Sequence, residues 1–133
     1  MLKLPAGVEY SLLAMLHLTL RYPGGELVKA ADIAAEQDVP LSFLERLLAQ
    51  LRAAGLLEST RGPGGGHRLS RPPDSITAGE VLTAIVGPGG GGARLRFLWE
   101  QCERALEDVL NVSLAELATQ WSHHTTDVAD YQI

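Results

Sequence analysis

The sequence predicts a mainly α-helical protein with a two-stranded β-hairpin and a long C-terminal helix. Apolar residues recur at helical spacing in three N-terminal segments. A glycine-rich run from Arg61 to Gly66 separates two short stretches of alternating polarity, which is typical of a hairpin. A second glycine run, from Gly87 to Gly92, precedes a further apolar helical pattern. The 133 residues amount to one ordinary domain with a helical extension.

The composition is that of a folded globular protein, with 46% hydrophobic and 20% charged residues. The single cysteine, Cys102, excludes an internal disulfide, a multi-thiolate zinc site and an all-cysteine iron–sulfur cluster. We therefore expect no cofactor and no metal. Without a signal-peptide pattern or a run of about 18 apolar residues, we expect a cytoplasmic protein with no membrane partner.

Charge is distributed unevenly along this acidic chain, whose net charge is −5. Between Ser42 and Pro72, five arginines oppose two glutamates, which leaves +3. From Phe97 to the end, one arginine opposes seven acidic residues, which leaves −6. This asymmetry favours a polyanion-binding surface in the middle of the chain.

The first two helices are expected at Val8–Tyr22 and Ala30–Gln37. The first has a broad apolar stripe and ends before Pro23. The second is followed by a tight turn, because the residue before Pro40 avoids helical backbone angles.

The third helix is expected to begin at Ser42 as N-cap, with Glu45 completing a capping box. Apolar residues follow at helical spacing, at Leu44, Leu47, Leu48 and Leu51. Gly55 then ends the helix. Three helices, with a tight turn between the second and third, match the helix-turn-helix arrangement.

A β wing is expected to follow, with strands over Leu56–Thr60 and His67–Ser70. After it, Thr77 and Glu80 form a capping box that begins a fourth helix. The fold class is thus a winged helix-turn-helix domain with a two-stranded wing and a long C-terminal dimerisation helix.

The predicted domains are a DNA-binding domain at 1–86, a glycine-rich linker at 87–93, dimerisation helices at 94–122 and a C-terminal tail at 123–133. Apolar residues after the linker recur at alternating three- and four-residue intervals, and these form the predicted dimer interface: Leu95, Leu98, Trp99, Cys102, Leu106, Val109 and Leu110. Because the first domain has few apolar faces left to receive this seam, a second copy of the chain is its expected partner. A capping box of Ser113 and Glu116 begins a last helix, which extends to Trp121.

Four sequence segments carry a resemblance to a known family: Leu44–Leu48, Leu51–Gly66 with its Arg-Gly-Pro-Gly-Gly-Gly wing, Ile76–Val81, and Leu98–Leu117. The chain resembles the Rrf2 family of bacterial winged helix-turn-helix transcription regulators over nearly its whole length. The resemblance implies a homodimer in which the long helix crosses its twin. It further implies that the recognition helices and wings bind double-stranded DNA at a near-palindromic operator. Since members usually occlude promoters, it implies a repressor.

Two departures from the family pattern affect the expected function. Several relatives hold an iron–sulfur cluster with three cysteines in the loop before the dimer helix, where this chain has its second glycine run. We therefore expect no cluster, and leave open a small molecule, a partner protein or the single thiol as effector. The first helix begins with Gly7, Val8 and Glu9 where relatives tend to carry basic residues, so a phosphate contact is expected to be missing.

The residues expected to contact DNA lie on the third helix and the wing: Ser42, Phe43, Glu45, Arg46, Arg61, Gly62, Pro63, Gly64, Gly65, Gly66 and His67. Arg46 can pair with guanine and Glu45 with the cytosine amino group. The wing glycines let the backbone approach phosphate. A nucleotide-binding loop would need a Gly-Lys-Ser/Thr ending, which is absent.

Simpler interpretations remain open at several of these positions. Ser42 and Glu45 can serve only as a helix cap, and His67 can be an exposed strand residue rather than a phosphate contact or pH-sensitive group. Cys102 fits an apolar core position better than a redox thiol.

Two further alternatives concern metal binding and the function as a whole. His123, His124 and Asp127 are residue types that can bind a metal, but a solvated tail fits this segment better than a metal site. No nucleophile, base and orienting group can be assembled, so we expect no enzyme. The alternative function is a dimeric winged-helix interaction protein that has lost DNA binding.

Overall fold

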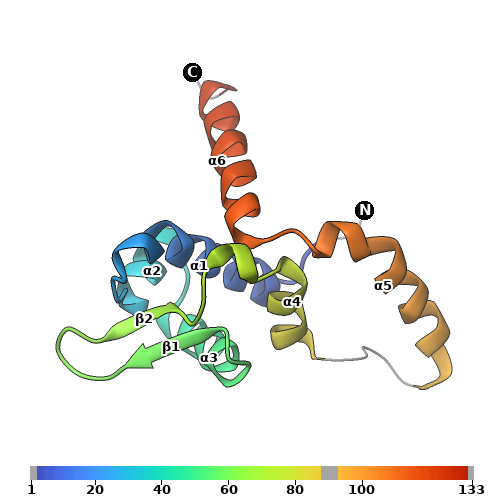
Figure 1. Ribbon diagram of the computed structural model, residues 1–133, viewed down its shortest axis with the longest axis horizontal. Coiled ribbons are helices and arrows are strands. Elements are labelled where there is room, and N and C mark those ends of the chain that lie inside the picture. The colour runs from blue at the N-terminus through green and yellow to red at the C-terminus, as the bar shows by residue number, and fades with distance from the viewer. Residues whose placement is uncertain (1–2, 88–92, 132–133) are drawn as a thin grey trace.

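The computed structural model describes residues 3–87 and 93–131, which form a mainly helical protein with one hairpin (Figure 1). Its elements in chain order are α1 (Ala6–Arg21), α2 (Ala30–Gln37), α3 (Leu41–Ala53), β1 (Leu57–Thr60), β2 (Gly66–Leu69), α4 (Ala78–Val86), α5 (Arg96–Leu110) and α6 (Leu114–Tyr131). Short 3₁₀ turns lie at Tyr22–Gly24, Pro73–Ser75 and Ala93–Leu95. The expected fold class is confirmed. The predicted linker falls almost entirely on 88–92, outside the described residues.

Helix α1 lies at the centre of the core and contacts α2, α3, α4, α6 and β2. Its Met15 and Leu18 are fully buried against Ile33 of α2 and the apolar face of α3. Burial of this apolar surface is the main force that holds the helices together. The polar outer face of α3 is thereby left to solvent.

The turn between α2 and α3 differs from the expected capping box. Helix α3 begins at Leu41, and Pro40 is its N-cap, with no side-chain capping bond. The ring fixes the φ of Pro40 at −56°, and its carbonyl accepts from the Leu44 N–H at 3.0 Å, so the N-cap lies two residues earlier than the expected Ser42. The capping box at Ser42 and Glu45 is therefore wrong. Both residues are exposed within the first turns of α3.

Gly55 ends helix α3, as expected. Gly55 has a φ of +81°, and its N–H donates to the Arg52 carbonyl at 2.9 Å. The Leu56 N–H donates to the Leu51 carbonyl at 3.0 Å. These two bonds form a Schellman motif, which turns the chain directly from α3 into β1.

The wing is an antiparallel hairpin that pairs Leu57 with Leu69 and Thr60 with Gly66. A third segment supports it, which the sequence did not indicate. Val28, in the loop before α2, pairs with His67 through two backbone hydrogen bonds of 2.8 and 2.9 Å. These bonds tie strand β2 of the wing to the N-terminal side of the helix-turn-helix.

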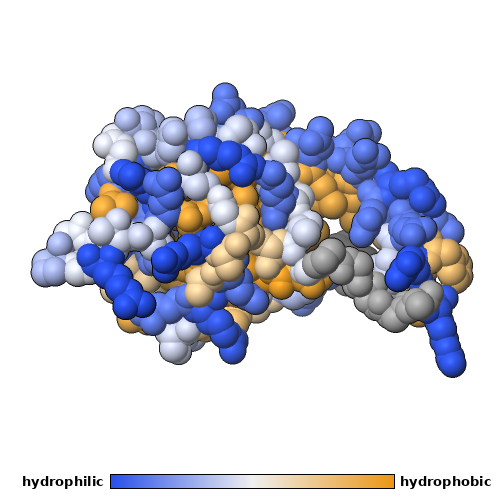
Figure 2. All heavy atoms as spheres, turned by 60° about the horizontal axis from the view of Figure 1, so that its bottom comes forward, coloured by the Kyte–Doolittle hydropathy of each residue, from blue (hydrophilic) through white to orange (hydrophobic). Residues whose placement is uncertain are grey.

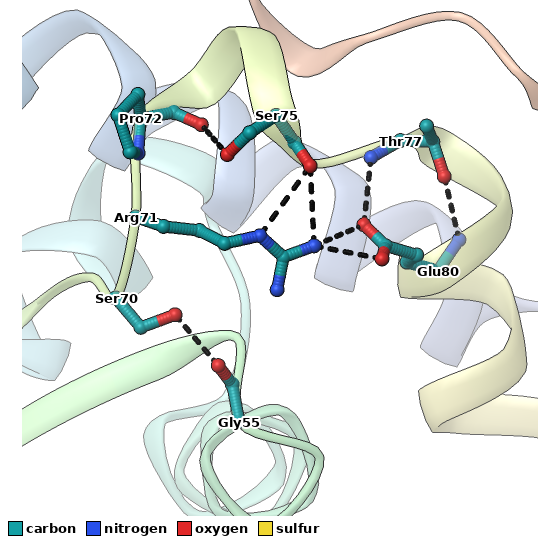
Figure 3. Close-up of polar contacts among 7 residues, drawn as sticks. All are labelled: Gly55, Ser70, Arg71, Pro72, Ser75, Thr77 and Glu80. Atoms are coloured by element: carbon teal, nitrogen blue, oxygen red, sulfur yellow. Dashed lines mark hydrogen bonds and ion pairs between the residues drawn. The ribbon is translucent and has the colours of Figure 1, made fainter.

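The segment between the wing and α4 is held by a polar cluster (Figure 3). Arg71 donates to the Ser75 carbonyl at 3.1 Å and to both oxygens of Glu80 at 2.6 and 2.7 Å. Glu80 also accepts from the Thr77 N–H, and the Thr77 hydroxyl accepts from the Glu80 N–H, which confirms the expected capping box. The ion pair therefore joins the exit of the wing to the start of α4.

The C-terminal helices attach to the domain at the turn between α5 and α6. The Leu114 N–H donates to the Ile76 carbonyl at 2.8 Å, and the Ala78 N–H donates to the Val112 carbonyl at 2.9 Å. Leu114 is fully buried and Ala118 nearly so, and the start of α6 therefore belongs to the core of the first domain. Helix α6 begins at Leu114, and the Ser113 hydroxyl accepts from the Glu116 N–H at 3.1 Å as an N-cap, as expected, but the helix continues past Trp121 to Tyr131.

Helix α5, by contrast, extends away from the domain and has no buried residue (Figure 1). Within the described residues, no helix combines the length and apolarity that crossing a membrane requires.

The buried position of Leu114 predicts a large loss of stability on truncation. We expect Leu114→Ala to lower the free energy of unfolding by about 2–5 kcal/mol, because it leaves a cavity between α6 and the core. Leu20→Ala, at a site on α1 that is 57% exposed, is the matched control and should change little. Urea denaturation measures both. Equal effects would show that α6 does not pack on the domain as described.

Candidate nucleic-acid interface

Helix α3 packs beside β1 of the wing, and their outer faces form the candidate surface; the wing lies at the end of the molecule opposite α5 (Figure 1). Ser42, Glu45 and Arg46 are exposed on α3, and Arg61 is exposed just after β1. The structure thus brings together most of the residues expected to contact DNA.

Phe43 faces the protein rather than the outside. Its ring packs edge-on against Tyr10 of α1, with the ring centroids 5.8 Å apart. The Arg46 guanidinium lies 5.3 Å from the centroid of the same ring. A cation over an aromatic face is attracted to it, so Phe43 supports Arg46 on the surface of α3. Phe43 is therefore suited to orient Arg46 rather than to lie on the outer surface itself.

Three arginines on this surface have no ion-pair partner among the described residues: Arg46, Arg52 and Arg61. The other arginines of the region are paired, Arg68 with Glu58 at 3.1 Å and Arg71 with Glu80. Unpaired guanidinium groups on α3 and beside the wing favour binding of an anion, because no carboxylate of the described residues forms an ion pair with them. Sequence reasoning missed Arg52. Arg52 lies two turns after Glu45 on α3, and this spacing was the signal in the sequence that could have identified it.

The wing tip has a backbone that requires glycine. Gly62 and Gly64 have φ angles of +98° and +78°, which side chains rarely adopt. A Cβ on Gly65 would overlap the Thr60 carbonyl, and a Cβ on Gly66 would lie 2.7 Å from the Val28 carbonyl oxygen. The tip therefore presents bare backbone, and Gly66 allows the close approach of Val28.

His67 is half-buried on β2 opposite Ser59, so the alternative of an exposed strand histidine is wrong. Its Nδ1 lies 2.7 Å from the Ser59 hydroxyl across the hairpin. Burial lowers the pKa of His67 below 6.5, and the nearby charge of Arg52 lowers it further, while Glu45 acts in the opposite direction. The ring is therefore neutral near pH 7.

The predicted dimer residues lie on α5, except Leu95 in the 3₁₀ turn before it, and they are largely uncovered. Leu98, Trp99 and Leu106 are 44–46% exposed, and Cys102 and Leu110 are partly exposed. Trp99, Cys102 and Leu106 face an open groove, whose other wall is α4. Figure 2 shows apolar surface in the middle of the molecule and again at its α5 end.

The donor set does not fit an iron–sulfur cluster. The only cysteine is Cys102 on α5, whereas a cluster needs several thiolate or imidazole ligands. The described residues contain no group of three or more histidine, cysteine, aspartate or glutamate side chains placed to hold a metal. His123 and His124 are exposed, and the side chain of Asp127 lies outside the described part.

A recognition helix with unpaired arginines beside a glycine-tipped hairpin defines the class of winged helix DNA-binding regulators. The profile of the Rrf2 family, described as an iron-dependent transcriptional regulator, matches residues 4–120. The chain belongs to the Rrf2 family. It is accordingly a DNA-binding transcriptional regulator of the Rrf2 type, as the sequence resemblance indicated, and not an enzyme.

Individual relatives agree with this assignment. The chain is 45% identical to the regulator IscR of Aliivibrio salmonicida over 130 residues, covering 87% of this chain and 77% of that protein. Its fold is similar to that of CymR, the global cysteine regulator of B. subtilis, with a TM-score of 0.75, 32% identity and coverage of 90% of this chain and 98% of the other. T. potens IscR also gives a TM-score of 0.75, with 31% identity and coverage of 90% and 88%.

The wing geometry predicts unequal tolerance of its glycines to alanine. Gly66→Ala should destabilise the protein more than Gly64→Ala, because the new Cβ collides with the Val28 backbone. At Gly64 nothing lies within 4 Å, and only the left-handed backbone is strained, at a cost of about 1–2 kcal/mol. Denaturation midpoints of the two variants compare them. Equal midpoints would contradict the close contact between Val28 and the wing.

Proposed function

We propose that the protein is a homodimeric repressor that binds a near-palindromic operator with α3 and the wing of each protomer, and that it works without an iron–sulfur cluster. The observation that carries the proposal is the group of unpaired arginines on the surface shared by α3 and the wing. In an acidic protein, such a group matches a phosphate backbone, which attracts lysine and arginine regardless of sequence.

Arg46 and Arg61 have different roles in DNA binding. Arg46 lies on the second turn of α3, the part of a recognition helix that meets base edges in the major groove, and Phe43 restricts its orientation. Arg61 stands at the entrance to the wing tip, where it suits phosphate or the electronegative minor groove. Ser42 and Glu45 do not cap α3, so their side chains are available to add DNA contacts from the same helix.

A second copy of the chain covers the exposed apolar face of α5. Half of the large exposed hydrophobic residues of the described chain lie on α5, and exposed apolar patches of this kind mark interaction sites. A dimer would also place two recognition helices on one DNA, as a palindromic site requires. Occupation of a promoter by such a dimer blocks transcription. The effector that relieves the block remains open between a small molecule, a partner protein and the Cys102 thiol.

Substitutions at the two arginines should separate their roles. Arg61→Ala should weaken binding to all DNA alike and flatten the dependence of log K on log salt by about 1.8 per dimer, since each protomer loses one phosphate contact. Arg46→Ala should cost about 1–3 kcal/mol per half-site on the operator and change nonspecific binding much less. Binding isotherms at several salt concentrations, on an operator selected from random DNA and on scrambled DNA, measure both.

Arg94→Ala, outside the proposed surface, removes the same charge and serves as the control. If the wild-type protein retains no DNA, or both surface variants leave every isotherm unchanged, the interaction-protein alternative replaces this proposal.

Dimerisation should depend on α5. Replacing Leu98 and Leu106 together by aspartate should yield monomers with normal helicity, because two carboxylates in an apolar interface are costly to bury. The same two aspartates at Gln101 and Arg104, outside the predicted seam on that helix, should leave the dimer intact. Sedimentation velocity measures mass, and circular dichroism measures helicity. A dimeric Leu98/Leu106 variant would place the interface elsewhere.

The purified protein should be colourless and free of stoichiometric iron and sulfide even after anaerobic preparation, because Cys102 alone cannot ligate a cluster. Visible absorption spectra and iron and sulfide analysis test this. Charge-transfer bands together with stoichiometric iron would show that other side chains complete a site.

A further inference from the structure

A hollow lies between α3 and the wing, on the surface that the proposed function assigns to DNA. One wall is the face of α3 that carries Glu45 and Arg52, and the other is the hairpin. The residues that line it are Ala30, Glu45, Leu48, Ala49, Arg52, Ser59, Thr60, Arg61 and His67. Polar groups thus surround the small apolar patch formed by Leu48 and Ala49.

The charges around the hollow favour an anion. Arg52 and Arg61 enter it from opposite walls, and neither has an ion-pair partner within the described chain. Glu45 is the one carboxylate in the lining, so two positive charges face one negative charge. Arg52 is also close enough to His67 to act on its ionisation. The Ser59 hydroxyl, which lies 2.7 Å from His67 Nδ1, adds an uncharged polar group on the hairpin side, of the kind that contacts phosphate oxygens.

We propose that this hollow binds one backbone phosphate of the bound DNA in each protomer, held by Arg52 from α3 and by the Ser59 hydroxyl from β1, with His67 beside that hydroxyl at 2.7 Å. The inference rests on the proposed function. It adds Arg52 to the binding residues and gives His67 a role other than direct contact.

A phosphate bound in this hollow would lie between α3 and the wing, two elements that read different grooves of the DNA. A phosphate there contacts α3 and the wing at once, so it sets the distance between them on the DNA. It also supplies at this position the backbone contact that the start of α1, with Gly7, Val8 and Glu9, does not offer.

The pKa of His67 changes when a phosphate binds in the hollow. In the free protein, burial and Arg52 hold the pKa of His67 below 6.5, against the opposing effect of Glu45. A phosphate beside Arg52 offsets that positive charge and raises the pKa, so DNA binding takes up protons. Affinity should therefore increase as the pH falls through the raised pKa of the complex. At higher pH, where His67 is neutral in both states, it contributes no dependence. Glu45 and Arg52 on α3, Ser59 on β1 and Arg61 beside it are the polar groups that share this hollow with the ring.

Salt titration of DNA binding tests the proposed phosphate site. Arg52→Gln should weaken binding equally on operator and scrambled DNA and flatten the log K against log salt slope by up to about 1.8 per dimer, from one lost contact per protomer. Arg104→Gln on α5 makes the same charge change away from the surface and should leave the slope unaltered. If Arg52→Gln leaves the salt slope unaltered, as Arg104→Gln does, while the wild type binds DNA, then the proposed phosphate site is wrong and the proposed function stands. If the wild type binds no DNA, both fail.

The pH dependence of the same isotherms tests His67. His67→Gln, which keeps a polar group beside Ser59, should abolish the increase in affinity at low pH, whereas His124→Gln at an exposed position should retain it. An unchanged pH dependence in His67→Gln would overturn the proton uptake.

Inorganic phosphate, added to the free protein at constant ionic strength, distinguishes a DNA phosphate from a free anion. We expect no saturable shift of the His67 imidazole resonances in NMR spectra. Saturable binding of inorganic phosphate, with an unchanged DNA salt slope in Arg52→Gln, would assign the hollow to a small anionic ligand and overturn the proposal.

Discussion

The backbone pairing between Val28 and His67 is the constraint on which the candidate DNA-binding surface depends. Two hydrogen bonds of 2.8 and 2.9 Å fasten strand β2 of the wing to the loop before α2. The pairing is possible because Gly66 has no Cβ to strike the Val28 carbonyl. An isolated two-stranded hairpin is at best marginally stable in water, and this third segment gives the wing a defined position beside α3.

The arginines of the basic region fall into two groups with different roles. Arg68 and Arg71 pair with Glu58 and Glu80, and so hold the hairpin and its exit to α4. Arg46, Arg52 and Arg61 are left without such partners among the described residues, on the outer face of the same region. The uneven charge of the sequence therefore has two parts. Some of the positive charge stabilises the fold, and the remainder is presented to an anion.

Several features were predictable from local sequence. The helix-turn-helix, the Gly55 helix end, the hairpin and the Thr77 cap each depend on residues close together in the chain, so short-range rules were sufficient. The start of α3 was misplaced because Pro40 and Ser42 both favour a helix N-terminus, and the backbone geometry of Pro40 prevailed. Of the candidate site, the Arg46 and Arg61 positions were expected, whereas Arg52 was missed. Arg52 follows Glu45 by seven residues and became noticeable only beside the hairpin.

The sequence by itself determined the order and type of the elements, the sign of charge in each part of the chain, and the shortage of cysteine ligands. Only the tertiary structure decided that Leu114 of α6 completes the core of the first domain, that Phe43 supports Arg46, and that His67 is half-buried opposite Arg52. Helix caps, turns and periodicity arise from neighbours within a few residues, and these can be inferred from a linear pattern. Burial and electrostatic environment depend on which distant segments meet, and that is settled only when the apolar faces of all the helices pack together.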